Sequence, residues 1–443
     1  MTPKHRKQCT SGPAPSATSE RISRRRFLKA SAAAFAAPTI IPATALGNET
    51  RLPPSERIVM GAIGVGGMGK GDMGSFMHSK EVQMVAVCDV DADFLSAAKK
   101  QVEDYYAKQS DKGSYKGCDG YTDFRDLMAR DDINAVTIGT PDHWHALISI
   151  AAAKAGKDIY CQKPLCLTIE QGRAMVNAVR RYARVFQTGS QQRSEYNGRF
   201  RRACEYVRSG RIGKVQTIHV SCGGPSGDCY LPAQPVPEGL DWDLWIGPAP
   251  WRPYNERLHP ASWRSYRDFS GGGMTDWGAH HFDIAQWALG MDNSGPVEIV
   301  PPDGKDVKRL TYKYANGVLM YHGGYTGPTS GILFTGTDGK IEVGRDHLAT
   351  YPKEIMEEPL SPDDVHLYKN AGHRPDLLHC IRTRQRPICD VEIGHRSVTV
   401  CHLGNIAYWL KRPLRWSPEK EEFVGDAEAN RWVGRPMRPP WTL

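Results

Sequence analysis

The sequence predicts an α/β protein of two domains: a first domain built on a parallel sheet and a second, α+β domain built on a large, mostly antiparallel sheet. Three observations support this prediction. The chain has 443 residues, more than one hydrophobic core ordinarily organises. Between residues 56 and 190, short apolar runs alternate with helical patterns, which is typical of parallel strands joined by helices. Beyond Gly290, short alternating runs separated by glycine turns are typical of antiparallel strands.

The first apolar run, residues 58–63, leads into a glycine-rich turn with the spacing G-x-G-x-x-G, which is typical of a strand that turns into a helix and holds a pyrophosphate. A second run, 82–87, ends at Asp89, 20 positions beyond Gly69, where a carboxylate can bond ribose hydroxyls. Val90-Asp91 adds no cation to receive a 2′-phosphate, so NAD is favoured over NADP. Residues 56–190 are therefore predicted to be a Rossmann domain whose NAD contacts include Gly64, Gly66, Gly67, Met68, Gly69 and Asp89.

The rest of the first domain continues the alternation. We predict helices over 94–108, 121–130, 146–155 and 169–184, a loop over 109–120, and strands over 133–138, 158–161 and from 185 to 193. The strand ending at residue 138 leads into Gly139-Thr140-Pro141-Asp142-His143-Trp144-His145, and the next leads into Gln162-Lys163-Pro164. Ligands gather at the carboxyl ends of parallel strands, so Thr140, Pro141, His145 and Lys163 are further candidates for contact with the cofactor.

The order of these motifs resembles the Gfo/Idh/MocA family of nicotinamide-dependent sugar and inositol oxidoreductases. The resemblance implies that Lys163 takes part in proton transfer. The usual Glu-Lys-Pro of that family is here Gln162-Lys163-Pro164. A glutamate would favour the charged form of the lysine, so the neutral amide is expected to make Lys163 easier to deprotonate or to change its orientation.

The second domain is predicted over residues 191–443 and is expected to bind substrate and form a homo-oligomer. We predict helices over 200–209, 376–384 and 393–410, and strands over 215–222, 297–300, 307–314, 318–322, 331–335 and 340–343. A glycine- and proline-rich loop is expected over 223–240, and the tail from Arg412 is expected to pack over the surface. The resemblance also implies that the open face of the sheet is an oligomer contact.

A second chemical stretch runs through Gly271-Gly272-Gly273 to Asp283. Asp276 and His280 are four residues apart, so if Asp276 opens a helix, the two side chains share one face about one turn apart. The segment matches the Gly-Gly-Gly-x-x-x-Asp-x-Gly-x-His-x-x-Asp pattern of the family, and the resemblance implies that Asp276, His280 and Lys163 surround the reacting carbinol. Asp283 is expected to support His280 or to orient the helix, and His281 to be a packed or capping residue.

A metal site is the alternative for this histidine cluster, because two histidines and an aspartate can bind zinc or iron. The segment lacks a His-Glu-x-x-His pattern, so no metal is predicted. The eleven cysteines contain no Cys-x-x-Cys pair, which argues against zinc ribbons, iron–sulfur clusters and a disulfide scaffold.

Aromatic and arginine side chains near these motifs are candidates for sugar contact, because pyranose faces stack on aromatic rings and hydroxyls accept charged hydrogen bonds. Ordinary packing is an equally good interpretation of each. The candidates are Trp144, Tyr230, Trp263, Arg264, Tyr266 and Arg267.

The formal net charge of +8 is concentrated at the N-terminus, where residues 1–45 carry eight Lys and Arg and one acid, Glu20. The rest of the chain is nearly neutral, which argues against nucleic-acid binding. Ser23-Arg24-Arg25-Arg26-Phe27-Leu28-Lys29, an alanine-rich apolar run and Ala43-Thr44-Ala45 resemble a twin-arginine export signal; a basic disordered tail is the alternative. The apolar run is short for a membrane span, so no stable insertion is expected.

The sequence therefore predicts a periplasmic or otherwise exported NAD-dependent oxidoreductase that acts on a hydroxyl of a sugar, sugar derivative or cyclitol. The hydroxyl proton would pass to His280 or Lys163. Because the twin-arginine machinery moves folded proteins with their cofactors inside, we expect the NAD to be tightly bound. One alternative is a glycoside hydrolase that oxidises a ring carbon, eliminates the aglycone, hydrates and reduces again with the same NAD. Another is a sugar-binding protein that retains the fold without turnover.

Overall fold

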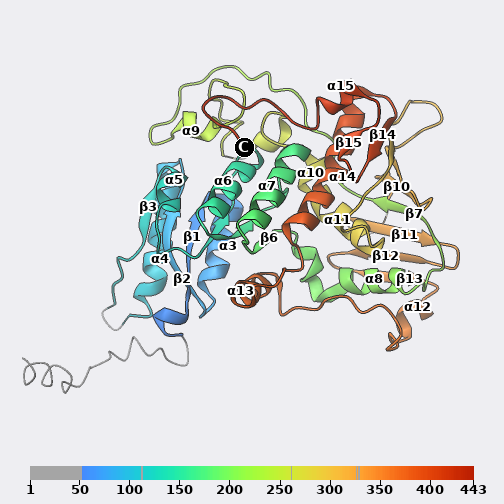
Figure 1. The fold of residues 1–443 in the computed structure, drawn as a ribbon, viewed down its shortest axis with the longest axis horizontal. Coiled ribbons are helices and arrows are strands. Elements are labelled where there is room, and N and C mark those ends of the chain that lie inside the picture. Colours follow the sequence, from blue (N-terminus) through green and yellow to red (C-terminus); the bar gives the residue numbers. More distant parts are fainter. Residues whose placement is uncertain (1–51, 111–112, 261, 326, 328–329) are drawn as a thin grey trace, which may run out of the picture. The chain divides into compact units, whose positions relative to one another are not determined.

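The computed structural model describes residues 52–443 except 111–112, 261, 326 and 328–329. The predicted export signal, residues 1–45, lies outside the described residues. The chain divides into one unit over residues 1–54 and a second, compact unit over residues 55–443, which contains both sheets (Figure 1). Across the described part of the chain, no helix has both the length and the apolar character that a membrane crossing requires.

The first sheet has six parallel strands in the order β3-β2-β1-β4-β5-β6. The strands are β1 (Ile58–Ile63), β2 (Val82–Cys88), β3 (Asp119–Tyr121), β4 (Ala135–Ile138), β5 (Asp158–Cys161) and β6 (Phe186–Thr188). The helices that connect them are α3 (Gly67–Met77), α4 (Ala92–Ala107), α5 (Phe124–Met128), α6 (Asp142–Lys154) and α7 (Ile169–Arg181). The strand order reverses between β1 and β4, which is the switch point at which such sheets bind ligands. The predicted Rossmann fold is confirmed.

Several predicted boundaries in this domain are wrong. The predicted loop over 109–120 ends in the strand β3, which is a short, exposed edge strand without an apolar pattern to reveal it. The predicted helix over 121–130 shrinks to α5 because the Asp123 side chain accepts from the Arg125 N–H and caps the helix there. The helix predicted from residue 146 begins at Asp142, since Pro141 has the extended conformation of an N-cap. The strand predicted over 185–193 is limited to β6.

The second sheet has nine strands in the order β13-β12-β11-β7-β10-β9-β8-β14-β15. Its strands are β7 (Val215–Val220), β8 (Glu298–Val300), β9 (Thr311–Lys313), β10 (Leu319–His322), β11 (Gly331–Gly336), β12 (Lys340–Gly344), β13 (Leu348–Tyr351), β14 (Leu414–Ser417) and β15 (Glu422–Phe423). β10 pairs with β7 in parallel and the other pairings are antiparallel, which confirms the predicted sheet type. The tail predicted to cover the surface instead supplies β14 and β15.

Among the remaining helical elements, η1 precedes β1 and the others lie beyond β6. They are η1 (Pro54–Glu56), η2 (Gln191–Arg193), η3 (Tyr196–Gly198), η4 (Ser262–Ser265), α8 (Arg199–Arg208), α9 (Trp242–Ile246), α10 (Gly273–Asp276), α11 (Gly278–Ala288), α12 (Glu354–Glu357), α13 (His373–Thr383), α14 (Val391–Leu410) and α15 (Ala427–Asn430).

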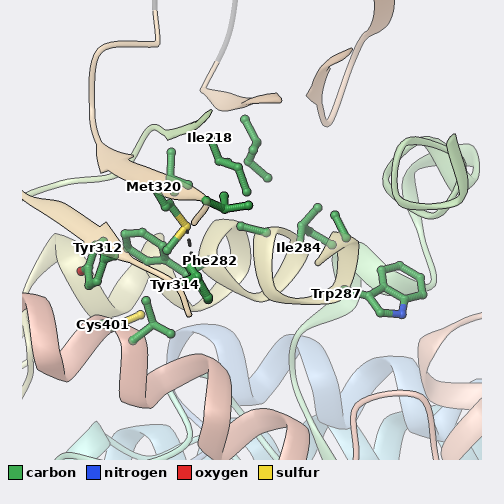
Figure 2. Packing of buried hydrophobic residues seen from close by; sticks show 14 of the residues in the cluster. Ile218, Phe282, Ile284, Trp287, Tyr312, Tyr314, Met320 and Cys401 are labelled. Atoms are coloured by element: carbon green, nitrogen blue, oxygen red, sulfur yellow. Dashed lines mark hydrogen bonds between the residues drawn. The ribbon is translucent and has the colours of Figure 1, made fainter. Parts of the chain in front are cut away.

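The helix α11 lies in the core of the second domain, and all its residues are buried. Figure 2 shows it between the sheet strands that carry Ile218 and Met320 and the helix α14 that carries Cys401. Phe282 packs edge-on against Tyr312, with ring centroids 5.4 Å apart. A helix buried on every side cannot rotate or slide without opening the core. Side chains at its N-terminal end are therefore held rigidly.

Helices from the C-terminal part of the sequence contribute residues to the hydrophobic cores of both sheets. Leu377, Leu378 and Ile381 of α13 belong to the hydrophobic core beneath β1 and β2, and Val391 and Val398 of α14 belong to the core beneath β4 and β5. In Figure 1, α14 lies beside α7. The core of the nucleotide-binding half therefore includes residues beyond 370, far outside the stretch 56–190.

Candidate active site

A cavity of about 320 Å³ opens at the switch point of the first sheet. The carboxyl ends of β1, β2 and β4 and the start of α3 form one wall, and residues between Leu244 and Arg264 form the other. Four of its lining residues from the second domain have no sequence motif that would predict them: Leu244, Trp245, His259 and Pro260. His259 is anchored by the side chain of Asp91, with Nε2 and Oδ2 2.8 Å apart.

The glycine turn closes tightly on itself. Gly64 has φ +73°, which favours glycine, and a Cβ on Gly69 would lie 1.8 Å from the Gly64 carbonyl oxygen. The carboxylate of Asp89 accepts from the Val65 N–H at 2.8 Å and from the Asp91 N–H at 3.1 Å. Asp89 also lines the cavity, so one side chain both fixes the loop and faces the space in front of it. Burial raises the pKa of Asp89.

Gly69→Ala should impair this turn. The new methyl group cannot fit 1.8 Å from a backbone oxygen, so the loop must shift, at a cost of roughly 1–3 kcal/mol. We expect a lower melting temperature and a marked loss of nucleotide from the purified protein, measured by absorbance after acid release.

Gly71→Ala is the matched control for this substitution, because it lies on the same helix and a Cβ there meets nothing within 4 Å. It should keep the nucleotide and match or exceed the wild-type melting temperature, since alanine favours helix. Equal nucleotide content in the two variants would contradict the role of Gly69.

Lys163 contacts Asp276 and lies close to His280, and the three residues belong to different elements. Lys163 Nζ contacts Asp276 Oδ1 at 2.6 Å and the Asp276 carbonyl oxygen at 3.1 Å. Asp276 ends the short helix α10 and does not open the helix of His280, which lies in the first turn of α11. Lys163 is close enough to His280 that its charge adds to burial in lowering the pKa of the imidazole well below its ordinary value.

His280 is buried, and its Nδ1 has no hydrogen-bond partner among the described residues. With its pKa lowered, the imidazole stays neutral at physiological pH and keeps one ring nitrogen able to accept a proton. His281 is packed: its Nδ1 bonds the Ser221 carbonyl, and burial lowers its pKa to about 4. Asp283 forms a buried ion pair with Arg193 at 2.8 Å and also accepts from Ser397. It therefore orients the helix, and among the described residues its hydrogen bonds go to Arg193 and Ser397 and not to His280.

Gln162 precedes Lys163 in the chain and is hydrogen-bonded to Asp72, a residue that no motif indicated. Its Nε2 donates to Asp72 Oδ2 of α3 at 2.6 Å, and its Oε1 accepts from the Lys163 N–H at 3.2 Å. Asp72 is fully buried and is paired with Arg374 of α13. The carboxyl group that the family usually has at position 162 is thus found one hydrogen bond away, on Asp72.

Of the predicted cofactor contacts near β4, two line the cavity and one connects neighbouring loops. Thr140 and Pro141 line the cavity, and Thr140 Oγ1 is buried there with no partner among the described residues. His145 is fully engaged, since Nε2 lies 2.9 Å from the Thr140 carbonyl and Nδ1 lies 2.8 Å from the Pro164 carbonyl. The ring therefore ties the two strand-end loops together and does not face the cavity.

Of the six predicted sugar contacts, Trp144, Trp263 and Arg264 line the cavity. Arg264 lies 3.8 Å from Asp276 and stacks on Trp263. The structure places the other three elsewhere, as parts of the fold or exposed surface. Tyr266 is buried in a cluster that includes Phe269, Arg267 is paired with Asp228 and stacked on Trp409 and Trp432, and Tyr230 is 88% exposed.

Over the described ranges of the chain, no group of three or more histidine, cysteine or carboxylate side chains is arranged to hold a metal ion.

Asp142 is a buried carboxyl group next to the site that sequence reasoning did not single out. Ser270 donates to its Oδ2 at 2.6 Å, and burial raises the pKa of Asp142 to about 7. The native state therefore holds a proton that the unfolded chain releases near pH 4. The resulting stability is complete below pH 4 and is lost, by about 1.4 kcal/mol per pH unit, as the pH rises toward 7.

Asp142→Asn should remove this pH dependence, because the amide keeps the acceptor for Ser270 and cannot ionise. Denaturant unfolding at pH 5 and pH 8 should show the variant gaining stability relative to wild type at the higher pH. Asp363→Asn, which alters an exposed carboxylate, should show no such gain. Parallel wild-type and Asp142→Asn curves across this range would contradict the assignment.

The strand order, the glycine turn and the cavity at the switch point define a two-domain dinucleotide-binding α/β protein. A family model described as the oxidoreductase family, NAD-binding Rossmann fold, matches residues 58–190. A second, the oxidoreductase family, C-terminal alpha/beta domain, matches residues 223–443. The chain belongs to the Gfo/Idh/MocA oxidoreductase family.

Individual proteins are similar to parts of the chain. A glycosyl hydrolase family 109 protein of Shewanella baltica is 32% identical over 177 residues, covering 36% of this chain and 37% of that protein. An alpha-N-acetylgalactosaminidase of Shewanella oneidensis is 32% identical over 165 residues, covering 34% and 35%. The chain thus spans little more than a third of the length of these curated relatives.

Among solved structures, the WlbA dehydrogenase from Bordetella pertussis, crystallised with NADH and UDP-GlcNAcA, shares the fold. Its TM-score is 0.57 at 18% identity, and the match covers 82% of this chain and 99% of that one.

Proposed function

We propose that this protein is an exported NAD-dependent oxidoreductase that acts on a hydroxyl of a sugar, sugar derivative or cyclitol. The observation that carries the proposal is the contact between Lys163 and Asp276 beside the neutral His280, on rigid elements next to the cavity of the glycine turn. Three groups with different charge states meet there, and a hydroxyl needs both a hydrogen-bond donor and a proton acceptor to be oxidised.

The residues around the cavity fit a dinucleotide. Gly67 has open space where a side chain would project, and the N-terminus of the eleven-residue helix α3 offers backbone N–H groups for a pyrophosphate. Asp89 would bond the ribose hydroxyls, and the unpartnered Thr140 Oγ1 is available farther along the cavity. The chemistry that NAD supplies is acceptance of a hydride from the carbinol carbon.

The chain's own residues then have distinct roles. Asp276 holds Lys163 by a 2.6 Å ion pair, which fixes the position of the ammonium group. The ammonium donates to the substrate oxygen and stabilises the negative charge that grows there. His280 takes the hydroxyl proton as the carbon loses its hydride, so that an alcohol becomes a carbonyl. The buried position of α11 keeps the imidazole in place throughout.

A second candidate is a glycoside hydrolase that uses the same oxidation transiently. The names of the Shewanella relatives favour this candidate. Oxidation of a ring carbon would acidify the neighbouring C–H, elimination would expel the aglycone, and hydration followed by reduction would restore the NAD.

Purified protein tests both candidates. Acid release should yield nicotinamide nucleotide at a near-stoichiometric ratio, because we propose that the cofactor is tightly bound. Release of nitrophenol from p-nitrophenyl α-N-acetylgalactosaminide without net change in NADH absorbance would favour the hydrolase. Stoichiometric NADH with an intact glycoside would favour the dehydrogenase. Protein free of nucleotide, with no affinity for added NAD, would contradict both.

Export through the twin-arginine machinery is also a proposal. It rests on the order of the arginine cluster, the apolar run and the small residues up to Ala45. Fractionation of cells that produce the full chain tests it, and retention of the protein in the cytoplasm would contradict it.

A further inference from the structure

Arg345 is an unusual cation close to the proposed active site. It lies in the turn between β12 and β13, and its guanidinium stacks over the rings of Tyr196 at 4.9 Å and Trp277 at 4.6 Å. Its Nε is buried with no hydrogen-bond partner among the described residues. Two aromatic rings thus hold the Arg345 guanidinium in place, and its buried Nε–H makes no hydrogen bond to the described residues.

The acids around Arg345 do not neutralise it. Glu195, which is close enough to feel its charge, is 3.8 Å from Arg374. Asp346 is its neighbour in sequence. Neither lies within 4.0 Å of the Arg345 guanidinium, and no other acid in the described ranges does. A buried donor left without an acceptor is costly, so the Arg345 Nε–H is available to an anionic ligand.

Around Lys163 the cations outnumber the carboxylates, whereas Asp89 and Asp123 line the neighbouring cavity. Lys163 and Arg264 share the single carboxylate of Asp276, at 2.6 and 3.8 Å. His280 is neutral, and the buried Asp142 carries only part of a charge near pH 7. Arg345 adds a further cation without adding an acid. A neutral sugar would leave this excess uncompensated.

The distance between Arg345 and His280 suits a single sugar unit. The Trp277 ring lies 4.6 Å from the guanidinium carbon and 6.0 Å from the His280 ring, so the guanidinium is within about 11 Å of the imidazole. Trp277 is 39% exposed, which leaves the region accessible from solvent. A substrate whose carbinol lies at His280 can extend an acidic substituent to Arg345.

We propose that the substrate is an acidic sugar, whose carboxylate or phosphate is bound by Arg345. The planar guanidinium fork matches two oxygens of either group. This inference rests on the proposed function for the position of the carbinol, but the anion site itself depends only on Arg345 and its surroundings.

Matched pairs of sugars test the proposal on the NAD-loaded protein. The pairs are glucuronate with glucose, galacturonate with galactose, and glucose 6-phosphate with glucose. Wild type should favour the acidic member of at least one pair by tenfold or more in kcat/KM. The pair that responds distinguishes carboxylate from phosphate.

Arg345→Gln should abolish this preference by raising KM for the acidic sugar while leaving kcat within a few-fold. Arg345→Lys, which keeps the charge without the fork, should retain part of it. Arg415→Gln, which alters an exposed arginine on β14, should behave as wild type. Equal use of acidic and neutral sugars by wild type, or an unchanged preference in Arg345→Gln, would overturn the proposal.

Calorimetric titration separates this inference from the proposed function. If no sugar is oxidised but glucuronate, galacturonate or glucose 6-phosphate binds wild type at least tenfold more tightly than Arg345→Gln, the proposed oxidation fails and the anion site stands. If none of these acids binds wild type, the anion site is overturned.

Discussion

His280→Gln should lower kcat by roughly 10²- to 10⁴-fold while the protein keeps its nucleotide, because glutamine fills the space of imidazole but cannot accept a proton at neutral pH. The acid limb of the wild-type kcat/KM profile should lie well below pH 6.5, since burial and the nearby Lys163 lower the pKa of His280. Turnover of the preferred sugar across pH, corrected for nucleotide content, provides the measurement.

His281→Gln is the matched control, because this neighbour is equally buried but is engaged with the Ser221 carbonyl. Its kcat per folded molecule should remain within a few-fold of wild type.

Two substitutions at Lys163 identify the proton acceptor. Arginine keeps a permanent cation beside Asp276 but cannot give up a proton, whereas methionine removes the charge. If Lys163→Arg is far more active than Lys163→Met, the ammonium role holds. If both are inactive while His280→Gln turns over, the roles are reversed.

Gln162→Glu should be strongly destabilising. It would place a second carboxylate 2.6 Å from Asp72, which is already fully buried and whose pKa is raised by that burial. Like charges cannot both be accommodated there, so we expect a loss of roughly 3–5 kcal/mol in the free energy of unfolding. Denaturant titration measures it, and Gln216→Glu, at an exposed position of β7, is the control.

The double variant Asp72→Asn/Gln162→Glu restores a single negative charge to this contact. The amide introduced at position 72 can donate to the carboxylate introduced at position 162, and Arg374 keeps a carboxylate nearby. The double variant should therefore recover more than half of the stability lost in Gln162→Glu, which is measured as a coupling energy between the two positions. If the two losses simply add, Asp72 and Gln162 do not act as a pair, and the charge has not been relocated between them.

The sequence indicated those parts of the site that depend on local spacing. The glycine turn, Asp89, Asp276 and His280 are each indicated by a few neighbouring residues. The structure places Asp89 against the glycine turn, Asp276 at the end of α10 and His280 at the start of α11. The contact among Asp72, Gln162 and Arg374 could not be predicted from the sequence, because Arg374 lies 302 residues from Asp72. No local pattern links a buried helix aspartate to either partner.

The same limit applies to the predicted sugar contacts. Arg264 and Arg267 are near neighbours with the same side chain, yet one faces the cavity and the other packs between tryptophans of α14 and the C-terminal tail. Composition cannot distinguish a ligand-facing arginine from a stacked one, since both need aromatic neighbours. Arg345 lies in a turn with no motif, and only the three-dimensional contacts reveal that it lacks an acid partner.

Because α13 and α14 pack against the first sheet, the hydrophobic core of that sheet is complete only after these two helices have been synthesised. Leu377 and Leu378 fill the core below β1 and β2, and Arg374 neutralises Asp72 behind the glycine turn. A ribosome that has released only residues 1–190 has therefore produced a nucleotide-binding half with an open core and an unneutralised buried acid. We therefore expect stable binding of NAD to require nearly the whole chain, which would make it a late step of maturation.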